Sequence, residues 1–322
     1  MSSSSSRLRV GVIGYGHVGR HHARILSELP DIDLAWIVDI DRQRAEQGAA
    51  AVGANAAFDA REIVGVDAVS VAVPTQSHLD VALPFLEQGV SVLVEKPLAG
   101  SLVDADRLIG AAAGSGATFG VGHTERFNPA VAAAVPLIAA PKFIEVHRLG
   151  TFPERSLDID VVFDVMIHDL DVVLSLVDSE VASIEAVGVA VLTDRVDIAN
   201  VRLKFGSGCI ANLTASRISR DQVRKIRWFQ HDAYVSIDYA TQTLEHWRLV
   251  RQNGRPPKIE GGKVEVVQEE PLKLELLDFL SAVRHRRAPT VDGAAGRRAL
   301  ALAQRIAEKI TTEGTEDTEN DK

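Results

Sequence analysis

The amino-acid sequence predicts an α/β protein: an N-terminal doubly wound parallel sheet, followed by a C-terminal α+β domain with a large, mostly antiparallel open sheet. Two patterns predict this division. Up to about residue 121, short apolar β-branched runs alternate with helical patterns, which is typical of a parallel sheet covered by helices on both faces. After about residue 140, strand-like runs follow one another across short polar turns, which favours antiparallel pairing.

The expected elements can be followed along the chain. The strand-like runs of the first part are LRVGVIG, LAWIVD, AVSVAVP, VSVLVE and ATFGVG, and segments such as HVGRHHARILSEL between them have helical periodicity. The second part begins with KFIEVHRLG and a helix at about 160–177, and it continues with SIEAVGVAVLT, ANVRLKF, GCIANLTASRI, AYVSIDY and TLEHWRLV. Two helices, at about 272–287 and 293–310, are expected to end the fold.

These patterns also give the domain limits that we expect. Residues 7–122 form the first domain, and residues 123–310 form the second. The serine run at 1–6 and the acidic, aperiodic segment 311–322 are expected to be disordered ends, because neither contains the apolar residues that a packed core needs.

Composition and charge argue against several protein classes. The 322 residues are 46% hydrophobic and 25% charged, as in globular proteins, and Lys+Arg 35 against Asp+Glu 44 gives a net charge of −9, which disfavours a nucleic-acid partner. The single cysteine, Cys209, excludes an internal disulfide and a cysteine-based zinc site. We interpret His17, His21 and His22 as ordinary helix residues and expect no metal, since no carboxylate or cysteine cluster accompanies them. No apolar run long enough for a membrane span occurs, and no apolar segment before the first strand indicates a secretory signal, so we expect a cytoplasmic protein without membrane insertion.

A glycine motif follows the first strand directly. In GYGHVG, Gly14 allows a tight turn, Gly16 a close approach of the backbone to a pyrophosphate, and Gly19 close packing of the next helix. The N-terminus of that helix adds free N–H groups and the positive end of its dipole. The second strand ends in Asp39, about 20 residues later, where a carboxylate accepts from ribose hydroxyls and repels a 2′-phosphate. The motif predicts a site that prefers NAD to NADP, with a flavin or a non-redox nucleotide as the alternative, and further contacts are expected from Tyr15, His17 and Val18.

Polar residues follow two later strands of the predicted parallel sheet. VAVPTQSH places Thr75 and His78 after one strand, and VSVLVEKP places Glu95 and Lys96 after the next. Ligands of such sheets bind outside the carboxyl ends of the strands, so we expect Thr75, His78 and Glu95 to contact the cofactor. Partial desolvation and the positive nicotinamide ring would lower the pKa of Lys96 and suit it to proton relay, unless it is an ordinary surface lysine.

The segment DVVFDVMIHDLDVVLSLVD predicts an apolar helix with one polar stripe. The stripe consists of residues three or four positions apart: Asp160, Asp164, His168, Asp171 and Ser175. Asp164 and His168 form an i,i+4 pair, in which the carboxylate fixes the tautomer of the imidazole or favours its protonated form. The stripe lines an interdomain cleft in one interpretation and is the solvated face of the helix in the other.

These segments carry a resemblance. GVIGYGHVGRHH, VAVPTQSH, VLVEKPLA, VGHTERFNPAV and DVMIHDLDVV resemble the Gfo/Idh/MocA family of nicotinamide-dependent sugar and polyol oxidoreductases, over about residues 8–310. The resemblance implies an NAD-binding Rossmann domain, followed by an α/β domain whose open sheet often mediates oligomerisation, and hence a homodimer or homotetramer. It also implies a catalytic triad, which maps onto Lys96, Asp164 and His168 of this sequence.

Part of that family is more similar still. GHTERFNPAV, VVFDVMIHDLD, DIANVRLKF and LTASRISRDQVRKIRWFQHDAYVSIDY resemble the members that oxidise C3 of UDP-N-acetylglucosamine for diamino-sugar lipid A synthesis. This resemblance implies a nucleotide-sugar substrate. A free polyol or aldose, as for inositol dehydrogenases, is the alternative substrate. A redox sensor that binds NAD(H) without turnover is the alternative class of protein.

A basic segment supports a phosphorylated substrate. The cations of SRISRDQVRKIRWF are Arg217, Arg220, Arg224, Lys225 and Arg227. Arginine matches a pyrophosphate through paired N–H donors. Alternation along a strand puts Arg217 and Arg220 on opposite faces, so not all five bind one ligand, and a solvated or subunit-interface strand is the alternative. The other candidates for substrate contacts are His123, Arg126, Asn128, Arg148 and Arg155.

Overall fold

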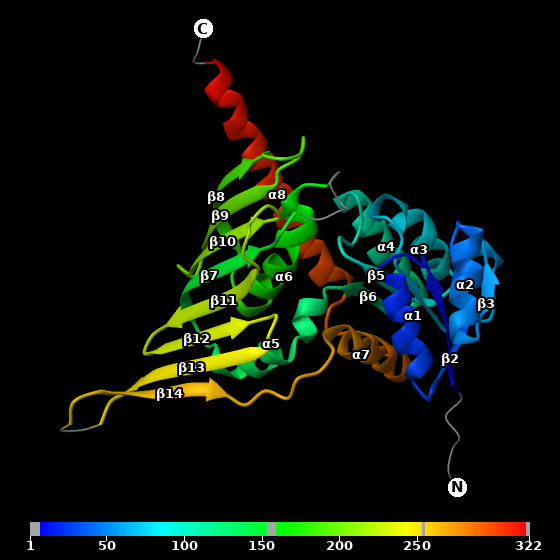
Figure 1. The fold of residues 1–322 in the computed structure, drawn as a ribbon, viewed down its shortest axis with the longest axis horizontal. Coiled ribbons are helices and arrows are strands. Elements are labelled where there is room, and N and C mark those ends of the chain that lie inside the picture. The colour runs from blue at the N-terminus through cyan, green and yellow to red at the C-terminus, as the bar shows by residue number, and fades with distance from the viewer. Residues whose placement is uncertain (1–6, 153–158, 253–254, 320–322) are drawn as a thin grey trace. The chain divides into compact units, whose positions relative to one another are not determined.

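The computed structural model of the chain describes residues 7–152, 159–252 and 255–319 (Figure 1). Its contacts divide the chain into two compact units, which are described separately below. Unit 1 comprises Met1–His123 and Leu272–Arg297, and unit 2 comprises Thr124–Pro271 and Arg298–Lys322. The disorder expected at 1–6 lies outside the described residues.

Unit 1 is built on a six-stranded sheet in the order β3-β2-β1-β4-β5-β6, in which every pair of neighbours is parallel. Its strands are β1 (Leu8–Ile13), β2 (Ile32–Val38), β3 (Asn55–Ala57), β4 (Ala68–Val71), β5 (Ser91–Glu95) and β6 (Phe119–Gly122). The helices between them are α1 (Gly19–Glu28), α2 (Arg42–Val52), α3 (His78–Glu87) and α4 (Leu102–Ser115). This order reverses between β1 and β4, as in doubly wound dinucleotide-binding sheets, and it confirms the predicted fold class.

Helix α7 (Pro271–His285) belongs to unit 1, although all strands of unit 2 precede it in the chain. Its buried residues Leu276, Phe279 and Leu280 join the hydrophobic cluster of α1 and β2. The expectation that residues 272–297 belong to the second domain is therefore wrong. An apolar helix face packs on whichever core the chain returns to, and here the chain returns to the first.

Unit 2 is built on an eight-stranded sheet in the order β14-β13-β12-β11-β7-β10-β9-β8. The first four strands in the chain are β7 (Pro141–Leu149), β8 (Val181–Val189), β9 (Ile198–Phe205) and β10 (Ile210–Ser216). The last four are β11 (Val223–Gln230), β12 (Ala233–Asp238), β13 (Thr243–Val250) and β14 (Lys258–Val264). Neighbours are antiparallel except β7 and β10, so the sheet is mostly antiparallel, as predicted.

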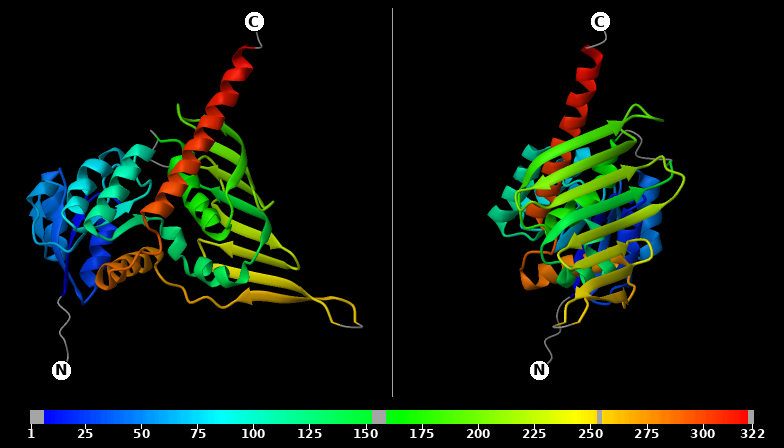
Figure 2. Two further views of the ribbon diagram at one scale, coloured as in Figure 1. Left: turned by 180° about the vertical axis from the view of Figure 1, so that it is seen from behind. Right: turned by 90° about the vertical axis from the view of Figure 1, so that its left-hand side faces the viewer.

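One face of this sheet carries the core of unit 2. Along β9, residues Ala199, Val201, Leu203 and Phe205 are buried, while Asn200, Arg202 and Lys204 between them are exposed, which is the period-2 alternation of a sheet covered on one side. Figure 2 shows the described helices of this unit on the core face, and none of them on the other. The open face carries a row of aromatic rings at paired positions: Phe143, Phe229, Tyr234 and Trp247.

Two elements near the end of the chain differ from the predicted ones: β14 is an additional strand, and α8 is longer than expected. Strand β14 contains two glycines and no buried residue, so it lacks the apolar alternation that predicts a strand. Helix α8 runs over Gly293–Glu319, so the expectation that residue 311 begins a disordered end is wrong for 311–319.

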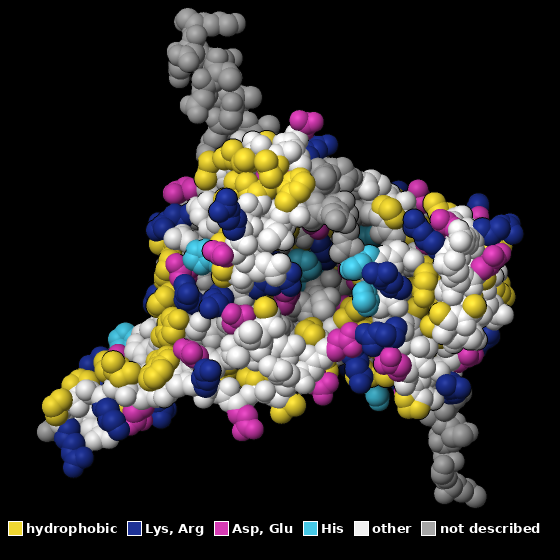
Figure 3. All heavy atoms as spheres, in the orientation of Figure 1, with side chains coloured by type: hydrophobic (Ala, Val, Ile, Leu, Met, Phe, Trp, Pro, Cys, Tyr) yellow, Lys and Arg dark blue, Asp and Glu magenta, His cyan; other side chains and the backbone are white. Residues whose placement is uncertain are grey.

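The surface is mixed in charge. On the face drawn in Figure 3, basic and acidic side chains are interspersed over unit 1 and unit 2 alike. Among the described residues, no helix combines the length and apolar character that crossing a membrane requires.

Candidate active site

Unit 1 contains a pocket of about 940 Å³ outside the carboxyl ends of β1, β2 and β4. This is the switch point of the sheet, where doubly wound folds bind their ligands. Five of the predicted cofactor residues line the pocket: Gly14, Gly16, His17, Val18 and Asp39.

The three glycines of the loop after β1 have different surroundings. A Cβ at Gly14 would meet the carbonyl of Ala72, and the φ of Gly14 is +90°, which favours glycine. A Cβ at Gly19 would overlap the carbonyl of Gly14, so this glycine allows α1 to pack closely. Nothing lies within 4 Å of a Cβ at Gly16. Gly16 is therefore the position where the missing side chain leaves room for a ligand, and this fits a pyrophosphate at the N-terminus of α1, whose first turn has no acidic residue.

Asp39 fixes the loop and faces the pocket. Its Oδ2 accepts a hydrogen bond from the backbone N–H of Tyr15 at 2.8 Å, and its Oδ1 accepts one from the N–H of Asp41 at 2.8 Å. Each carboxylate oxygen keeps a second lone pair, so the ribose hydroxyls fit here as acceptor partners. The ring of Tyr15 packs against Gly48 of α2, and its backbone N–H is the group held by Asp39.

Residues after β3 complete the pocket. Phe58 and Arg61 line it, and the guanidinium of Arg42 lies over the ring of Phe58 at 4.0 Å. The sequence motifs do not predict these residues. Their only signal is their place after a three-residue strand, which is too short to be predicted with confidence from its side chains.

His78 does not line this pocket. It is 1% exposed, with Nδ1 at 3.2 Å from the carbonyl of Leu98 and Nε2 at 3.0 Å from the carbonyl of Val73. Burial lowers its pKa. The side chain joins the segments that follow β4 and β5, which corrects the expectation from sequence. Thr75 begins the short 3-10 turn Thr75–Ser77 before α3 and is half-buried.

Glu95 ends β5, and Lys96 follows it. Oε1 of Glu95 lies 3.0 Å from Nε2 of His22, and Nδ1 of His22 lies 2.6 Å from Oγ of Ser70. Burial alone would raise the pKa of Glu95, but the hydrogen bond and charge of His22, with Lys96 nearby, hold it below its usual value. His22 is thus no ordinary helix residue, and the Glu95 carboxylate is directed to it rather than to the cofactor pocket.

A second carboxylate belongs to this cluster. Glu275 of α7 is 1% exposed, and the ligand-type atoms of His22, Glu95 and Glu275 lie within 4.8 Å of one another. Within this buried cluster, His22 and Glu95 contact each other directly. Lys96 itself is half-buried at the strand end.

In unit 2, Asp164 and His168 lie at the junction of two helical segments. Val162–Met166 is a π-helical turn, and α6 (Ile167–Leu176) continues from it. The prediction of one regular α-helix over 160–177 is therefore wrong at its start. Such turns are common at functional sites because they change the direction in which side chains point. Both residues are half-buried.

The rest of the polar stripe is not a solvated face. Asp171 is 2% exposed and lies 3.4 Å from Nη1 of Arg126. Ser175 donates from Oγ to the carbonyl of Val172 at 2.7 Å. Oδ1 of Asp160 accepts from the N–H of Val196 at 3.1 Å. Asp164 and His168 are the other two residues of the stripe.

Arg148 does not have the environment of a substrate ligand. Its Nε and Nη2 donate to the Asp169 carboxylate at 2.6 and 3.0 Å, and Nη1 donates to Glu125 at 2.8 Å. Burial would lower the pKa of Arg148, but these two carboxylates raise it well above its usual value. The expectation of anion binding is corrected: Arg148 is a buried partner of the residue that follows His168.

Among the other substrate candidates, Asn128 also has a structural role. Asn128 is 2% exposed, caps α5 (Pro129–Ala134) through the N–H of Ala130 at 3.1 Å, and donates to the carbonyl of Tyr239 at 3.1 Å. His123 is buried after β6 and does not line the pocket. Arg126 keeps partial exposure, and Arg155 lies outside the described residues.

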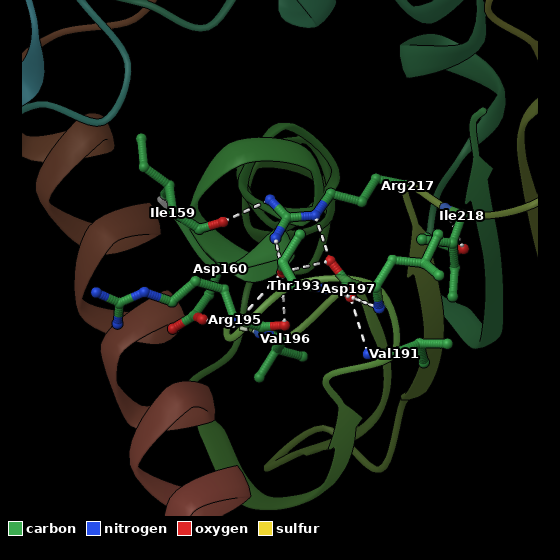
Figure 4. A network of polar contacts seen from close by, with 11 residues as sticks. Ile159, Asp160, Val191, Thr193, Arg195, Val196, Asp197, Arg217 and Ile218 are labelled. Carbon is green, nitrogen blue, oxygen red and sulfur yellow. Dashed lines mark hydrogen bonds and ion pairs between the residues drawn. The ribbon is translucent and has the colours of Figure 1, made fainter. Parts of the chain in front are cut away.

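The basic segment does not form one anion site. Arg217 is 2% exposed and donates to Asp197, to Thr193 and to the carbonyl of Ile159, which corrects its assignment to the substrate (Figure 4). Arg227 donates to Glu145 at 2.6 Å on the open face. The segment therefore supplies structural ion pairs.

Comparisons with known proteins agree with this geometry. Residues 8–123 match the family model described as "Oxidoreductase family, NAD-binding Rossmann fold" (Gfo/Idh/MocA), and residues 148–231 match the Gfo/Idh/MocA C-terminal domain. UDP-N-acetylglucosamine 3-dehydrogenase of Acidithiobacillus ferrooxidans is 39% identical, over 93% of this chain and 96% of that protein. A solved structure of that enzyme has a TM-score of 0.88 at 37% identity and covers 94% of this chain and 98% of its own.

Two further relatives are more distant. The scyllo-inositol 2-dehydrogenase (NAD+) of Bacillus subtilis is 26% identical over 88% of this chain and 89% of its own. The structure of a levoglucosan dehydrogenase in complex with NADH and levoglucosan has a TM-score of 0.85 at 18% identity, covers 96% of this chain and 98% of its own, and shows the shared fold alone.

Proposed function

Because the chain belongs to the Gfo/Idh/MocA family of NAD-binding oxidoreductases, we propose that it oxidises C3 of UDP-N-acetylglucosamine to the 3-keto sugar. The observation that carries this proposal is the 39% identity to a UDP-N-acetylglucosamine 3-dehydrogenase over 93% of the chain, a span that includes both units. Two inositol dehydrogenases of similar coverage are only 26% and 28% identical.

The chain's own residues bind and orient the cofactor. The backbone at Gly16 and the N-terminus of α1 hold the pyrophosphate, and Asp39 accepts from the ribose hydroxyls and repels a 2′-phosphate. NAD⁺ supplies the hydride acceptor for the oxidised carbon. The protein contributes position and electrostatics around that transfer.

We assign the proton transfer to Lys96, Asp164 and His168. His168, oriented by Asp164, takes the proton of the sugar hydroxyl while the carbon loses its hydride, which leaves the C3 ketone. Lys96 donates a hydrogen bond to the same sugar oxygen while the charge of that oxygen changes. His168 and Lys96 exchange these roles in the alternative assignment, because both side chains can accept a proton.

The test is absorbance at the NADH band after protein, NAD⁺ and UDP-N-acetylglucosamine are mixed, with a carbonyl trap to remove the ketone. Parallel samples contain myo-inositol and free N-acetylglucosamine. We expect NADH with the nucleotide sugar alone. NADH with a free polyol would replace the proposed substrate by that of the inositol dehydrogenases. NAD binding without turnover on any of the three would favour a redox sensor.

The open face of the large sheet supports a homodimer or homotetramer. Phe229 is 37% exposed and Trp247 is 39% exposed in the aromatic row, and exposed valines gather at the β8 edge (Figure 3). Burying such rings between copies removes apolar surface from water. Light scattering of the wild type and of Trp247→Arg tests this, with a smaller particle expected for the variant.

We place the reaction in the cytoplasm, as a step that supplies a 3-keto sugar for diamino-sugar lipid A synthesis.

A further inference from the structure

Arg217 is the centre of a buried polar network in unit 2 (Figure 4). Its Nε donates to Oδ1 of Asp197 at 2.8 Å, its Nη2 to Oγ1 of Thr193 at 3.0 Å, and its Nη1 to the carbonyl of Ile159 at 2.6 Å. With 2% exposure and each guanidinium nitrogen donating to a protein acceptor, the side chain is held in one place.

Asp197 makes this network rigid. Its Oδ2 accepts the backbone N–H groups of Val191, Leu192 and Thr193 at 2.9, 2.7 and 3.0 Å. Burial alone would raise its pKa, but these N–H groups and Arg217 lower it far below its usual value. Asp197 is thus a fixed charge that closes the loop between β8 and β9 and holds Arg217.

The network reaches the segment that leads to Asp164. Besides the Arg217 bond to the carbonyl of Ile159, Val196 of the same loop accepts from the N–H of Val161 at 2.9 Å and donates to Oδ1 of Asp160 at 3.1 Å. The carbonyl of Asp160 in turn accepts the N–H of Asp164 at 3.1 Å. Arg217 therefore binds the carbonyl of Ile159, and the carbonyl of the next residue, Asp160, binds the N–H of Asp164.

The helical segment that starts there needs such an anchor. A π-helical turn such as Val162–Met166 occurs mainly as a single turn inside an α-helix, so its geometry depends on what fixes its two ends. At the far end, Arg148 holds Asp169 of α6. At the near end, Arg217 and Val196 contact residues 159–161.

We propose that Arg217 is a positioning residue for catalysis: through the carbonyl of Ile159 it fixes the start of the π turn, and thereby the direction in which Asp164 faces His168. This inference rests on the proposed function. It replaces the sequence-based idea that Arg217 binds the pyrophosphate of the substrate.

The first test compares Arg217→Lys with the wild type. Lysine keeps the charge beside Asp197 but has no planar fork to reach Ile159 and Thr193 as well. We expect kcat to fall about 10-fold or more, with KM for UDP-N-acetylglucosamine and the dissociation constant of NAD changed less than about 3-fold. The matched control is Arg227→Lys on β11, the same exchange at an ion pair of the open face, which should leave kcat and KM unchanged.

A double variant sharpens this result. If Arg217 acts through Asp164, then Arg217→Lys in an Asp164→Asn background should lower kcat no further, because the group that it positions is already disabled. Equal fold-losses in both backgrounds, a KM raised 10-fold with kcat retained, or wild-type kinetics in Arg217→Lys would each overturn the proposal.

Two further measurements keep the proposal testable. Should Arg217→Lys not fold, Asp160→Ala loosens the same anchor from the Val196 side and should also lower kcat rather than raise KM. Hydrogen exchange of residues 159–168 should accelerate in Arg217→Lys while β9 stays protected. Hydrogen exchange can be measured without turnover. A wild type inactive on every sugar would refute the proposed function, and the exchange rates of residues 159–168 would still test this inference. Unchanged exchange there would refute the inference alone.

Discussion

Nε2 of His22 lies 3.0 Å from Oε1 of Glu95, and Oε2 of the same carboxylate accepts the backbone N–H of Lys96 at 3.3 Å. The pair thus links the interior of unit 1 to the residue that we assign to proton transfer. Because both carboxylate oxygens are engaged within the protein, Glu95 acts by holding the end of β5.

This relationship gives a prediction for stability. His22→Leu would leave the buried Glu95 carboxylate without its imidazole partner, and a buried charged group that loses its hydrogen-bond partner costs about 3 kcal/mol of unfolding free energy. Adding Glu95→Gln removes the buried charge and should recover part of that loss. Chemical denaturation of the single and double variants measures both effects. Arg24→Ala, at the exposed pair with Glu28, is the control and should cost under about 1 kcal/mol. Equal costs for His22→Leu and Arg24→Ala would contradict the buried pair.

Much of the fold could be predicted from local patterns. The glycine loop, the apolar runs of β1, β4 and β5, and the alternation along β9 each lie within a few residues of sequence, where side-chain period reveals the structure. The pocket residues Gly14, Gly16 and Asp39 follow from the same local motif. These local patterns do not specify which hydrophobic core a later helix joins. The sequence therefore predicts α7 in the second domain, whereas its residues from Leu272 onward belong to unit 1.

Partners distant in the chain account for the errors at the site. Arg148 is 21 residues from Asp169, and Arg217 is 20 residues from Asp197. An arginine pattern indicates affinity for carboxylates and phosphates alike, so the sequence could not decide between a ligand and a carboxylate of the same chain. The π turn before α6 is equally hidden, since its apolar spacing also fits an α-helix.

Gly16 gives a prediction for the cofactor. A methyl group there meets no protein atom, so Gly16→Ala should keep the wild-type unfolding free energy and weaken NAD binding by about 10-fold or more, as the Cβ takes the space of the pyrophosphate. Calorimetric titration with NAD measures this. Gly110→Ala, also in open space but on α4, should leave NAD binding unchanged and stabilise the helix by about 0.5–1 kcal/mol. Unaltered affinity in Gly16→Ala would place the pyrophosphate elsewhere.

The buried imidazole of His78 predicts a dependence of stability on pH. Burial lowers its pKa in the folded state, whereas in the unfolded chain it takes a proton near pH 6.5. Between these two values the unfolded state binds more protons, so the contribution of His78 is fully present above about pH 6.5 and is lost as the pH falls below it. The difference in unfolding free energy between about pH 7.5 and about pH 5.5 should therefore be smaller in His78→Gln than in the wild type.

His231 supplies the control for that measurement. Its side chain is 84% exposed, so His231→Gln should leave the pH-dependent difference close to that of the wild type. If His78→Gln and His231→Gln behaved alike, the imidazole of His78 would have to titrate as it does in the unfolded chain, and its burial between Leu98 and Val73 would not govern its charge.

The assigned acid–base residues give the last prediction. Removing a group that transfers a proton in the transition state usually lowers turnover by about 10²–10⁴-fold, so Lys96→Ala and His168→Ala should each lose at least about 10² in kcat. Neither residue lines the cofactor pocket, so the dissociation constant of NAD should stay near its wild-type value. Lys204→Ala, on the exposed face of β9, is the control for loss of a lysine. The pH dependence of kcat in the two variants then separates their roles, because the variant that lacks the base loses the rise of kcat with pH and the other retains it. Wild-type turnover in either variant would remove that residue from the mechanism.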